Sequence, residues 1–419
     1  MKIVIQQMRK KLNIPDGLRV VTLPSDSPVV YCGIAVHAGT RHERPGEEGL
    51  AHFCEHLTFK GTRRRTAMRI INDIEGLGGE LNAFTNKEDT VFYCAILREH
   101  LSKAIDVLTD IVFCSTYPQA EVEKESEVVC DEIESYEDSP AELIYDEFEN
   151  ILFEGHPLGH NILGTSEQVR SYTSADACRF TQQWYKPENC VLFMNLPQPF
   201  PKGGEPDVLA ACGIDSDSKT YQSPLPLGGV GGGVRVGGGT ITRHRGTHQA
   251  HVMLGTRAFA ANDNRRWALY LLNNILGGPG MNSRLNLSLR ERRGLVYTVE
   301  SSMVSYSDTG LWSVYFGCDP ADVNRCLRLV RRELDRLIEQ PLSAAQLRNA
   351  KRQLQGQLAI ACENREQYTL DYARTFLHTG HGRTLADVMA HIETLSSDDL
   401  QQCARQLFAP EQLTTLIYL

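Results

Sequence analysis

Residues 49–62 read GLAHFCEHLTFKGT and place His52, Glu55 and His56 within five positions of one another. Each helical residue turns the chain by about 100°, so positions i, i+3 and i+4 lie on one face of a helix. These three side chains would therefore converge if the stretch is helical. Their neighbours are mostly apolar: Leu50, Ala51, Phe53, Cys54 and Leu57. Polar groups buried in such surroundings need compensation, and a metal ion would supply it.

The pattern could supply two ligands and a proton acceptor to a hydrolytic zinc site. Such an ion takes three protein ligands and keeps a fourth position open for water. His52 and His56 would supply two ligands, and Glu55 would accept a proton from the water. The third ligand must come from elsewhere in the chain. The alternative interpretation is that two histidines beside a glutamate are ordinary surface residues.

An acidic segment offers the third ligand. Residues 121–138 read EVEKESEVVCDEIESYED, which we project onto a helix centred on Val129. Glu125 and Glu132 fall within roughly 60° of Val129, two turns apart. The apolar members of the same stripe are Val122, Ile133 and Tyr136, whereas the acids that point away, as on a solvated face, are Glu123, Glu127, Asp131 and Glu134. An unpaired charge in an apolar stripe is costly, so Glu125 and Glu132 are the candidate ligands.

The pattern H-x-x-E-H at 52–56, with Glu132 following His56 by 76 positions, resembles the inverzincin signature of the pitrilysin or insulinase metallopeptidases. The resemblance implies that His52, His56 and Glu132 bind one zinc ion per chain. It also implies that Glu55 is the general base. Glu125 resembles a second family acid that supports the site without being a primary ligand.

The segment GGELNAFTNKEDTVFYC at 78–94 resembles the family strand that pairs with the substrate backbone. Asn82 and Ala83 would lie near the scissile bond, and Phe84 and Thr85 continue the same strand. An extended peptide that adds to a sheet edge gains affinity through its backbone, so the demands on its sequence stay loose. Without the family, an ordinary core hairpin is the alternative.

The segment SRLNLSLRERRGLVYTVESS at 283–302 resembles the family segment that carries an arginine and a tyrosine seven residues apart. Here these residues are Arg290 and Tyr297, whose donors would hold the peptide carbonyl and stabilise the tetrahedral oxyanion. Taken alone, an arginine and a tyrosine at this spacing are ordinary surface residues.

The two halves of the chain resemble each other. Each has strand-like alternation, a helical run and later two helical segments joined at a proline, Pro118 or Pro341. We expect an α+β fold with two homologous domains, 1–196 and 241–419, each a mainly antiparallel sheet packed with long helices. A Pro/Gly-rich linker at 197–240 would join them. Aligning the two prolines puts Gln355 where Glu132 stands, so the first domain should bind the metal.

Composition and length limit the possible partners, location and oligomeric state of the protein. The net charge of -9 argues against a nucleic-acid partner, and no stretch approaches the roughly 18 apolar residues of a membrane span. The N-terminus resembles no signal peptide, so we expect a cytoplasmic protein with mostly buried, reduced cysteines. The length of 419 residues resembles the mitochondrial-processing-peptidase-like branch of the family. That branch implies a homodimer, or a heterodimer with a partner lacking half of the site.

These observations predict a zinc endopeptidase that hydrolyses unfolded or short peptides, bound as an added strand in a cleft between the two domains. Glu55 would take a proton from water and return it to the leaving amine. One alternative is a non-catalytic peptide-binding or assembly subunit of a family heterodimer. Another is a metal-dependent hydrolase that acts on non-peptide substrates.

Overall fold

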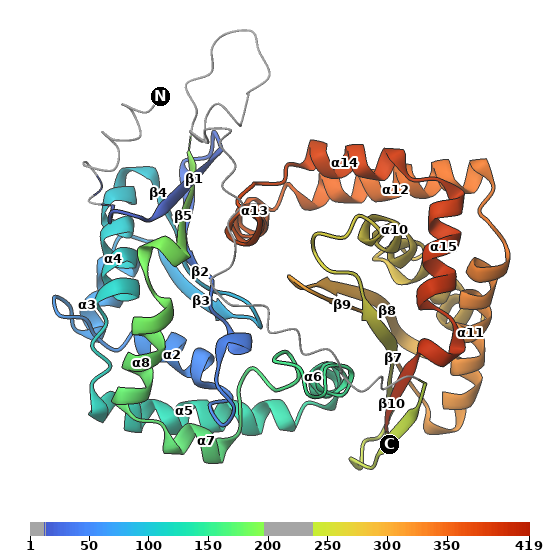
Figure 1. Ribbon diagram of the computed structural model, residues 1–419, viewed down its shortest axis with the longest axis horizontal. Coiled ribbons are helices and arrows are strands. Elements are labelled where there is room, and N and C mark those ends of the chain that lie inside the picture. Colours follow the sequence, from blue (N-terminus) through green and yellow to red (C-terminus); the bar gives the residue numbers. More distant parts are fainter. Residues whose placement is uncertain (1–11, 13, 197–237) are drawn as a thin grey trace, which may run out of the picture. The chain divides into compact units, whose positions relative to one another are not determined.

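The computed structural model describes residue 12 and residues 14–196 and 238–419 (Figure 1). The chain forms two compact units. Unit 1 comprises residues 1–133, 160–231 and 363–383, and unit 2 comprises residues 134–159, 232–362 and 384–419. Each unit is built on a sheet of five strands.

The sheet of unit 1 has the strand order β1-β5-β2-β4-β3. Its strands are β1 (Arg19–Pro24), β2 (Val29–Val36), β3 (Glu80–Thr85), β4 (Thr90–Leu97) and β5 (Cys190–Leu196). Only β1 and β5 pair in parallel, and the other neighbours are antiparallel. The strand β3 therefore lies at one edge of this sheet.

One face of the unit 1 sheet packs against helices of the N-terminal half (Figure 1). These are α2 (Leu50–Thr58), α3 (Ala67–Glu75), α4 (Leu101–Cys114), α5 (Gln119–Glu137), α7 (Ser166–Ser171) and α8 (Ser174–Trp184). The inward residues of β2, such as Ile34, are fully buried against them. Branched side chains such as that of Ile34 suit a sheet packed against helices.

Unit 2 repeats this plan with the strand order β6-β10-β7-β9-β8. Its strands are β6 (Thr240–Arg243), β7 (Ala250–Ala258), β8 (Val296–Ser305), β9 (Gly310–Cys318) and β10 (Thr414–Tyr418). Its helices include α10 (Arg266–Gly277), the π-helix η4 (Asn286–Glu291), α11 (Val323–Glu339), α12 (Ala344–Ala361), α14 (Leu385–Thr394) and α15 (Ser397–Leu407). The predicted α+β class with two similar domains is confirmed.

Each unit takes a covering helix from the other half of the sequence. The second face of the unit 1 sheet packs against α13 (Arg365–Thr379), through a cluster that includes Phe193 and Phe376. The second face of the unit 2 sheet packs against α6 (Pro140–Leu152), through a cluster that includes Phe148. Both faces of each sheet are apolar, so each needs a cover on both sides.

The compact units therefore differ from the contiguous domains 1–196 and 241–419 that the sequence suggests. Residues 197–237 of the expected linker 197–240 lie outside the described residues. Within the described parts of the chain, no helix is long and apolar enough to cross a bilayer.

Asp89, before β4, joins α13 to the sheet of unit 1. Its carboxylate accepts hydrogen bonds from Arg374 at 2.9 Å and from His378 at 2.8 Å. Burial opposes ionisation of Asp89, but these partners outweigh it and hold its pKa well below the ordinary value. A depressed carboxyl pKa adds stability that is present above the unfolded-state pKa of about 3.9 and is lost as the pH falls below it.

We expect Asp89→Asn to lower the free energy of unfolding by about 2–4 kcal/mol near neutral pH, because Arg374 and His378 lose their charged acceptor. The deficit should shrink as the pH falls below about 4, because the unfolded chain then takes up a proton at Asp89 while the folded chain still holds the carboxylate charged. Urea unfolding across this pH range measures both effects, with Asp26→Asn at an exposed loop position as the control. A deficit that does not change with pH would contradict the assignment.

Candidate metal centre

The helix α2 carries the H-x-x-E-H pattern and begins at a tightly enclosed turn. Its N-cap residue, Gly49, has a φ of 93°, in the left-handed region that favours glycine. A Cβ at this position would lie 2.5 Å from the carbonyl oxygen of Leu163. Only glycine fits both the conformation and the space, so this position fixes where α2 starts.

Glu43 holds the first turn of α2 from outside the helix. Its carboxylate accepts hydrogen bonds from the backbone N–H groups of Ala51 at 2.7 Å and Gly49 at 3.1 Å. The Nε2 atom of His160 lies 2.9 Å from the same carboxylate. Free N–H groups at a helix start need such acceptors, and α2 has no acidic residue in its own first turn. Glu43 thereby positions the helix that carries His52 and His56.

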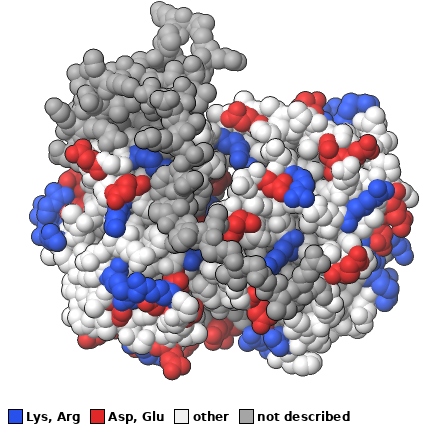
Figure 2. Space-filling model, viewed as in Figure 1, with Lys and Arg blue, Asp and Glu red and all other residues white. Residues whose placement is uncertain are grey.

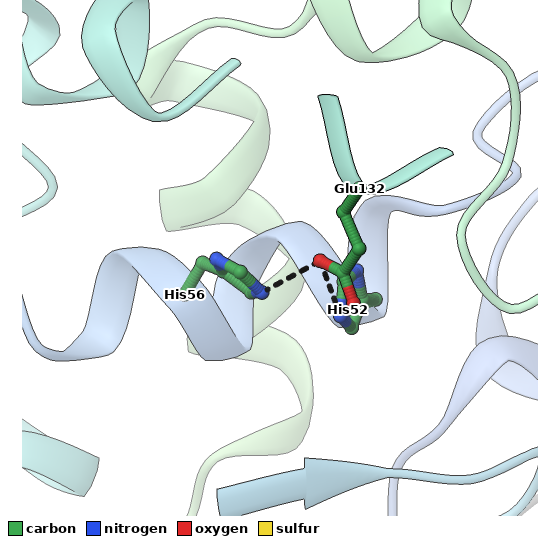
Figure 3. Close-up of side chains that lie close together, drawn as sticks. All are labelled: His52, His56 and Glu132. Carbon is green, nitrogen blue, oxygen red and sulfur yellow. Dashed lines mark ion pairs between the residues drawn. The ribbon is translucent and has the colours of Figure 1, made fainter. Parts of the chain in front are cut away.

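Three side chains converge between α2 and α5, as Figure 3 shows. His52 and His56 come from α2 and Glu132 from α5. The Oε2 atom of Glu132 lies 3.4 Å from Nε2 of His56 and 3.8 Å from Nε2 of His52. One ligand atom from each residue lies within 4.8 Å of the others. The structure therefore brings together the three residues that the sequence proposed as ligands.

The donor set and its spacing fit a zinc ion. A tetrahedral zinc ion with bonds of about 2.0–2.2 Å holds its ligand atoms about 3.3–3.6 Å apart. The distances of 3.4 Å and 3.8 Å from Glu132 to the two imidazoles are close to this range. Two imidazole nitrogens and one carboxylate oxygen are also the donors of many hydrolytic zinc sites, in which a fourth position stays open.

The two histidines have opposite electrostatic surroundings. Burial lowers the pKa of His52 to about 4, and the neighbouring His56 acts in the same direction. Burial also disfavours the charged form of His56, but hydrogen bonds with Glu125 and Glu132 outweigh it and raise its pKa to about 9. The carboxylates of Glu125 and Glu132 beside His56 favour a cation next to the imidazoles, and the lowered pKa of His52 keeps its imidazole neutral, as a metal ligand must be.

Glu55 lies next to this group and contacts the edge strand β3. It is 8% exposed, and its Oε2 atom accepts a hydrogen bond of 2.6 Å from the hydroxyl of Thr85. Burial raises the pKa of the Glu55 carboxyl, although the bond from Thr85 acts against this rise. A carboxylate with a raised pKa holds a proton more readily, as a general base requires.

Glu125 supports His56 from the side opposite the metal group. Its Oε1 atom lies 3.1 Å from Nδ1 of His56, and its Oε2 atom accepts a hydrogen bond of 2.6 Å from Lys60. Burial opposes ionisation of Glu125, but these two partners lower its pKa. With Nδ1 engaged by a carboxylate, Nε2 of His56 is left to face Glu132 and a metal ion. Lys60 follows His56 by about one helical turn, but the spacing alone gave no sign that it pairs with Glu125.

We expect Glu125→Gln to weaken zinc affinity by about 10–100-fold, because the partner that orients His56 loses its charge. Competition with a coloured chelator measures this affinity. Glu123→Gln, at an exposed position on the same helix, is the control and should leave the affinity unchanged. Equal zinc affinities for both variants would remove Glu125 from the site.

The helical projection of α5 is correct for Glu125, which is 6% exposed, but less so for Glu132. The side chain of Glu132 remains 45% exposed and points at the two histidines rather than into the core. Cys54, between the histidines, is fully buried and faces the carbonyl oxygen of Ala177. It lies outside the group of converging ligands.

Arg290 and Tyr297 lie in unit 2, on η4 and at the start of β8. The Tyr297 side chain is 83% exposed, and the Arg290 side chain is 45% exposed. Both residues line one cavity of about 620 Å³ in that unit. Their role as donors to a peptide carbonyl stays a prediction.

Comparisons with known proteins agree with this geometry. Residues 19–166 match the family described as Insulinase (Peptidase family M16), and residues 225–354 match the Peptidase M16 inactive domain. An uncharacterized zinc protease of Streptomyces coelicolor is 35% identical over 95% of this chain and 87% of its own. One of Bacillus subtilis is 32% identical over 98% of both chains.

A solved structure of a protease from Helicobacter pylori has the same fold. Its TM-score is 0.81 at 22% identity, over 96% of this chain and 97% of that chain. The matched residues 19–166 contain the whole converging group and Glu55. With its ligand geometry and its near full-length zinc protease relatives, the chain belongs to the insulinase family of zinc proteases, peptidase family M16.

Proposed function

We propose that this protein is a zinc endopeptidase that cleaves unfolded or short polypeptides bound as an added strand on the edge of the unit 1 sheet. One zinc ion per chain would be held by His52, His56 and Glu132. Membership of a peptidase family makes peptides the expected substrates. The proposal also includes action in the cytoplasm and, from the resemblance to two-domain relatives, a homodimer.

One observation carries the proposal: the hydrogen bond between Glu55 and Thr85 ties the candidate base to the edge strand. Among the described strands of unit 1, β3 pairs with β4 alone, so its second edge remains available. Asn82 is exposed, and Ala83 and Phe84 are half-buried. A peptide that pairs with this edge is therefore guided towards Glu55 by its backbone, whatever its side chains are.

The chain's own residues would share the chemistry as follows. A bound zinc ion lowers the pKa of water and polarises a carbonyl group. Glu55 would accept a proton from the attacking water and later deliver it to the leaving amine nitrogen. Arg290 and Tyr297 would donate hydrogen bonds to the carbonyl oxygen as its negative charge develops. The strand β3, from Asn82 to Thr85, would hold the peptide extended.

The strand proposal is tested with N-methylated substrates. In an added strand, the backbone N–H groups of alternate residues face the edge. Two isomers of one unstructured fluorogenic peptide would carry N-methyl groups on one or the other alternate set. We expect cleavage of one isomer to be abolished and that of the other to be largely kept. Equal loss for both isomers would exclude strand addition, and an inactive, metal-free protein would instead indicate a non-catalytic subunit.

A further inference from the structure

A polar cavity in unit 2 lies outside the features that the proposed function uses. It has a volume of about 480 Å³ and lies between η4, the end of α11 and the start of α12. Its lining residues are Arg284, Leu287, Arg292, Glu333, Arg336, Gln340, Pro341, Leu342 and Gln346. All of them belong to unit 2.

The lining of this cavity is strongly basic. It holds three guanidinium groups and one carboxylate, and thus a formal charge of +2, in a chain whose net charge is -9. On the face shown in Figure 2, the described acidic and basic side chains are interspersed. The single acid, Glu333, is engaged by Arg336 at 2.8 Å. Glu333 also attracts the charge of Arg284, but one carboxylate cannot balance the three guanidinium groups of the lining.

Arg284 is the residue that most needs a further partner. It is half-buried, and among the residues that the structure describes it has no hydrogen-bonded or ion-paired partner. Burial lowers its pKa from the ordinary value. A partly desolvated guanidinium has lost water without gaining an acceptor, and an anion in the cavity would restore that interaction.

Neutral donors surround the same space. Gln346 lines the cavity, and its Oε1 atom accepts a hydrogen bond of 2.9 Å from the N–H of Ser343, so this bond does not use its amide N–H groups. The helix α12, of 18 residues, begins at Ala344, so its positive end lies beside the lining residues Leu342 and Gln346. Helix starts and arginine forks are both favourable for phosphate oxygens.

We propose that this cavity binds the phosphate dianion of a small ligand, with Arg284, Arg292 and Arg336 as its cationic contacts. The formal charge of the lining matches a dianion rather than a single carboxylate. Pockets of about 300–1,000 Å³ hold small organic ligands, so the volume has room for a phosphate ester as well as for free phosphate. The proposal does not depend on the zinc site.

Isothermal titration of the full-length protein with inorganic phosphate, pyrophosphate and glucose 6-phosphate tests the proposal at low ionic strength, with acetate as the monovalent control. We expect saturable binding of at least one phosphate probe, and no binding of acetate. Binding of all three probes would point to a site for free phosphate, and binding of glucose 6-phosphate alone would point to an ester. Binding should weaken as salt is added, because the contacts are ionic.

Two variants locate the site. Arg284→Gln and Arg336→Gln should each weaken binding by about 10-fold or more, as expected for lost hydrogen bonds to a charged group. Arg325→Gln is the matched control, because Arg325 lies on the same helix as Arg336. The side chain of Arg325 is 54% exposed and that of Arg336 is 51% exposed, and each pairs with an acid three residues earlier. Thermal unfolding confirms that each variant is folded. Absence of binding by all probes, or unchanged binding in both variants, would overturn the proposal.

Discussion

Replacement of Glu55 by glutamine is expected to slow peptide cleavage by about 10²–10⁴-fold while the protein keeps its zinc. Glutamine preserves the size of the side chain and can still contact Thr85, but it cannot hold a proton. None of the three converging ligands is changed, so metal binding should persist. Cleavage of an unstructured fluorogenic peptide and the zinc content of the same preparation measure the two properties separately.

Glu75→Gln provides the control, since Glu75 is exposed at the end of α3. It should behave like the native chain in both measurements. If Glu55→Gln cleaved the peptide at the native rate, Glu55 would not be the base. If it lost zinc as well as activity, the residue would act on the metal group rather than on the proton.

Replacement of Glu132 by glutamine is expected to remove both zinc and activity. Glu132 is the only member of the converging group that comes from α5, so its loss leaves two imidazoles on one helix. Two neutral ligands hold a zinc ion far more weakly than three ligands that include a carboxylate. The zinc content, measured by metal analysis after dialysis, should fall from the expected value of about one ion per chain to a small fraction of that value.

Glu134→Gln on the same helix is the matched control, because Glu134 is exposed and lies outside the group. Full zinc content in Glu132→Gln would show that the third ligand is a different residue. The pair of results from Glu55 and Glu132 separates proton transfer from metal binding, which no measurement of activity alone can do.

The convergence of His52, His56 and Glu132 could be predicted from the sequence because two regular periods narrow the candidates. The spacing of His52 and His56 puts both on one face of a helix, and the apolar stripe of α5 selects Glu125 and Glu132 from many acids. Their division into a ligand and a supporting residue came only from the resemblance. The structure adds the physical reason, since Glu125 faces Nδ1 of His56 and Glu132 faces Nε2.

The supporting contacts could not be predicted, because they join residues far apart in the chain. Glu43 and His160 are separated by 117 positions, and Thr85 and Glu55 by 30. No local period connects such residues. The cavity at Arg284 was hidden for the same reason: Arg284 and Arg292 flank η4, whereas Arg336 lies on α11, and the three appear in the sequence as scattered charges.

The helices α6 and α13 are exchanged between the two halves of the chain, since each covers the sheet of the other half. One feature of the sequence indicates that such covers are needed. The strand β9, GLWSVYFGC, is apolar at most positions and buried along its whole length. Continuous burial of this kind requires a cover on both faces of the sheet, whereas alternation would require only one. The strand pattern therefore predicts that helices pack on both faces of the sheet. It does not predict which helices these are, because that depends on tertiary contacts.

This exchange makes the two halves of the chain a complementing pair. A half-chain ending before residue 197 would carry α6 without the sheet it covers and would leave the apolar residues that pack on α13 open to solvent. Each half expressed alone should therefore be prone to aggregation. If the intact protein is cut once within residues 197–237, the two fragments should stay associated, because each carries a helix that packs in the core of the other. The two halves should also associate when they are mixed.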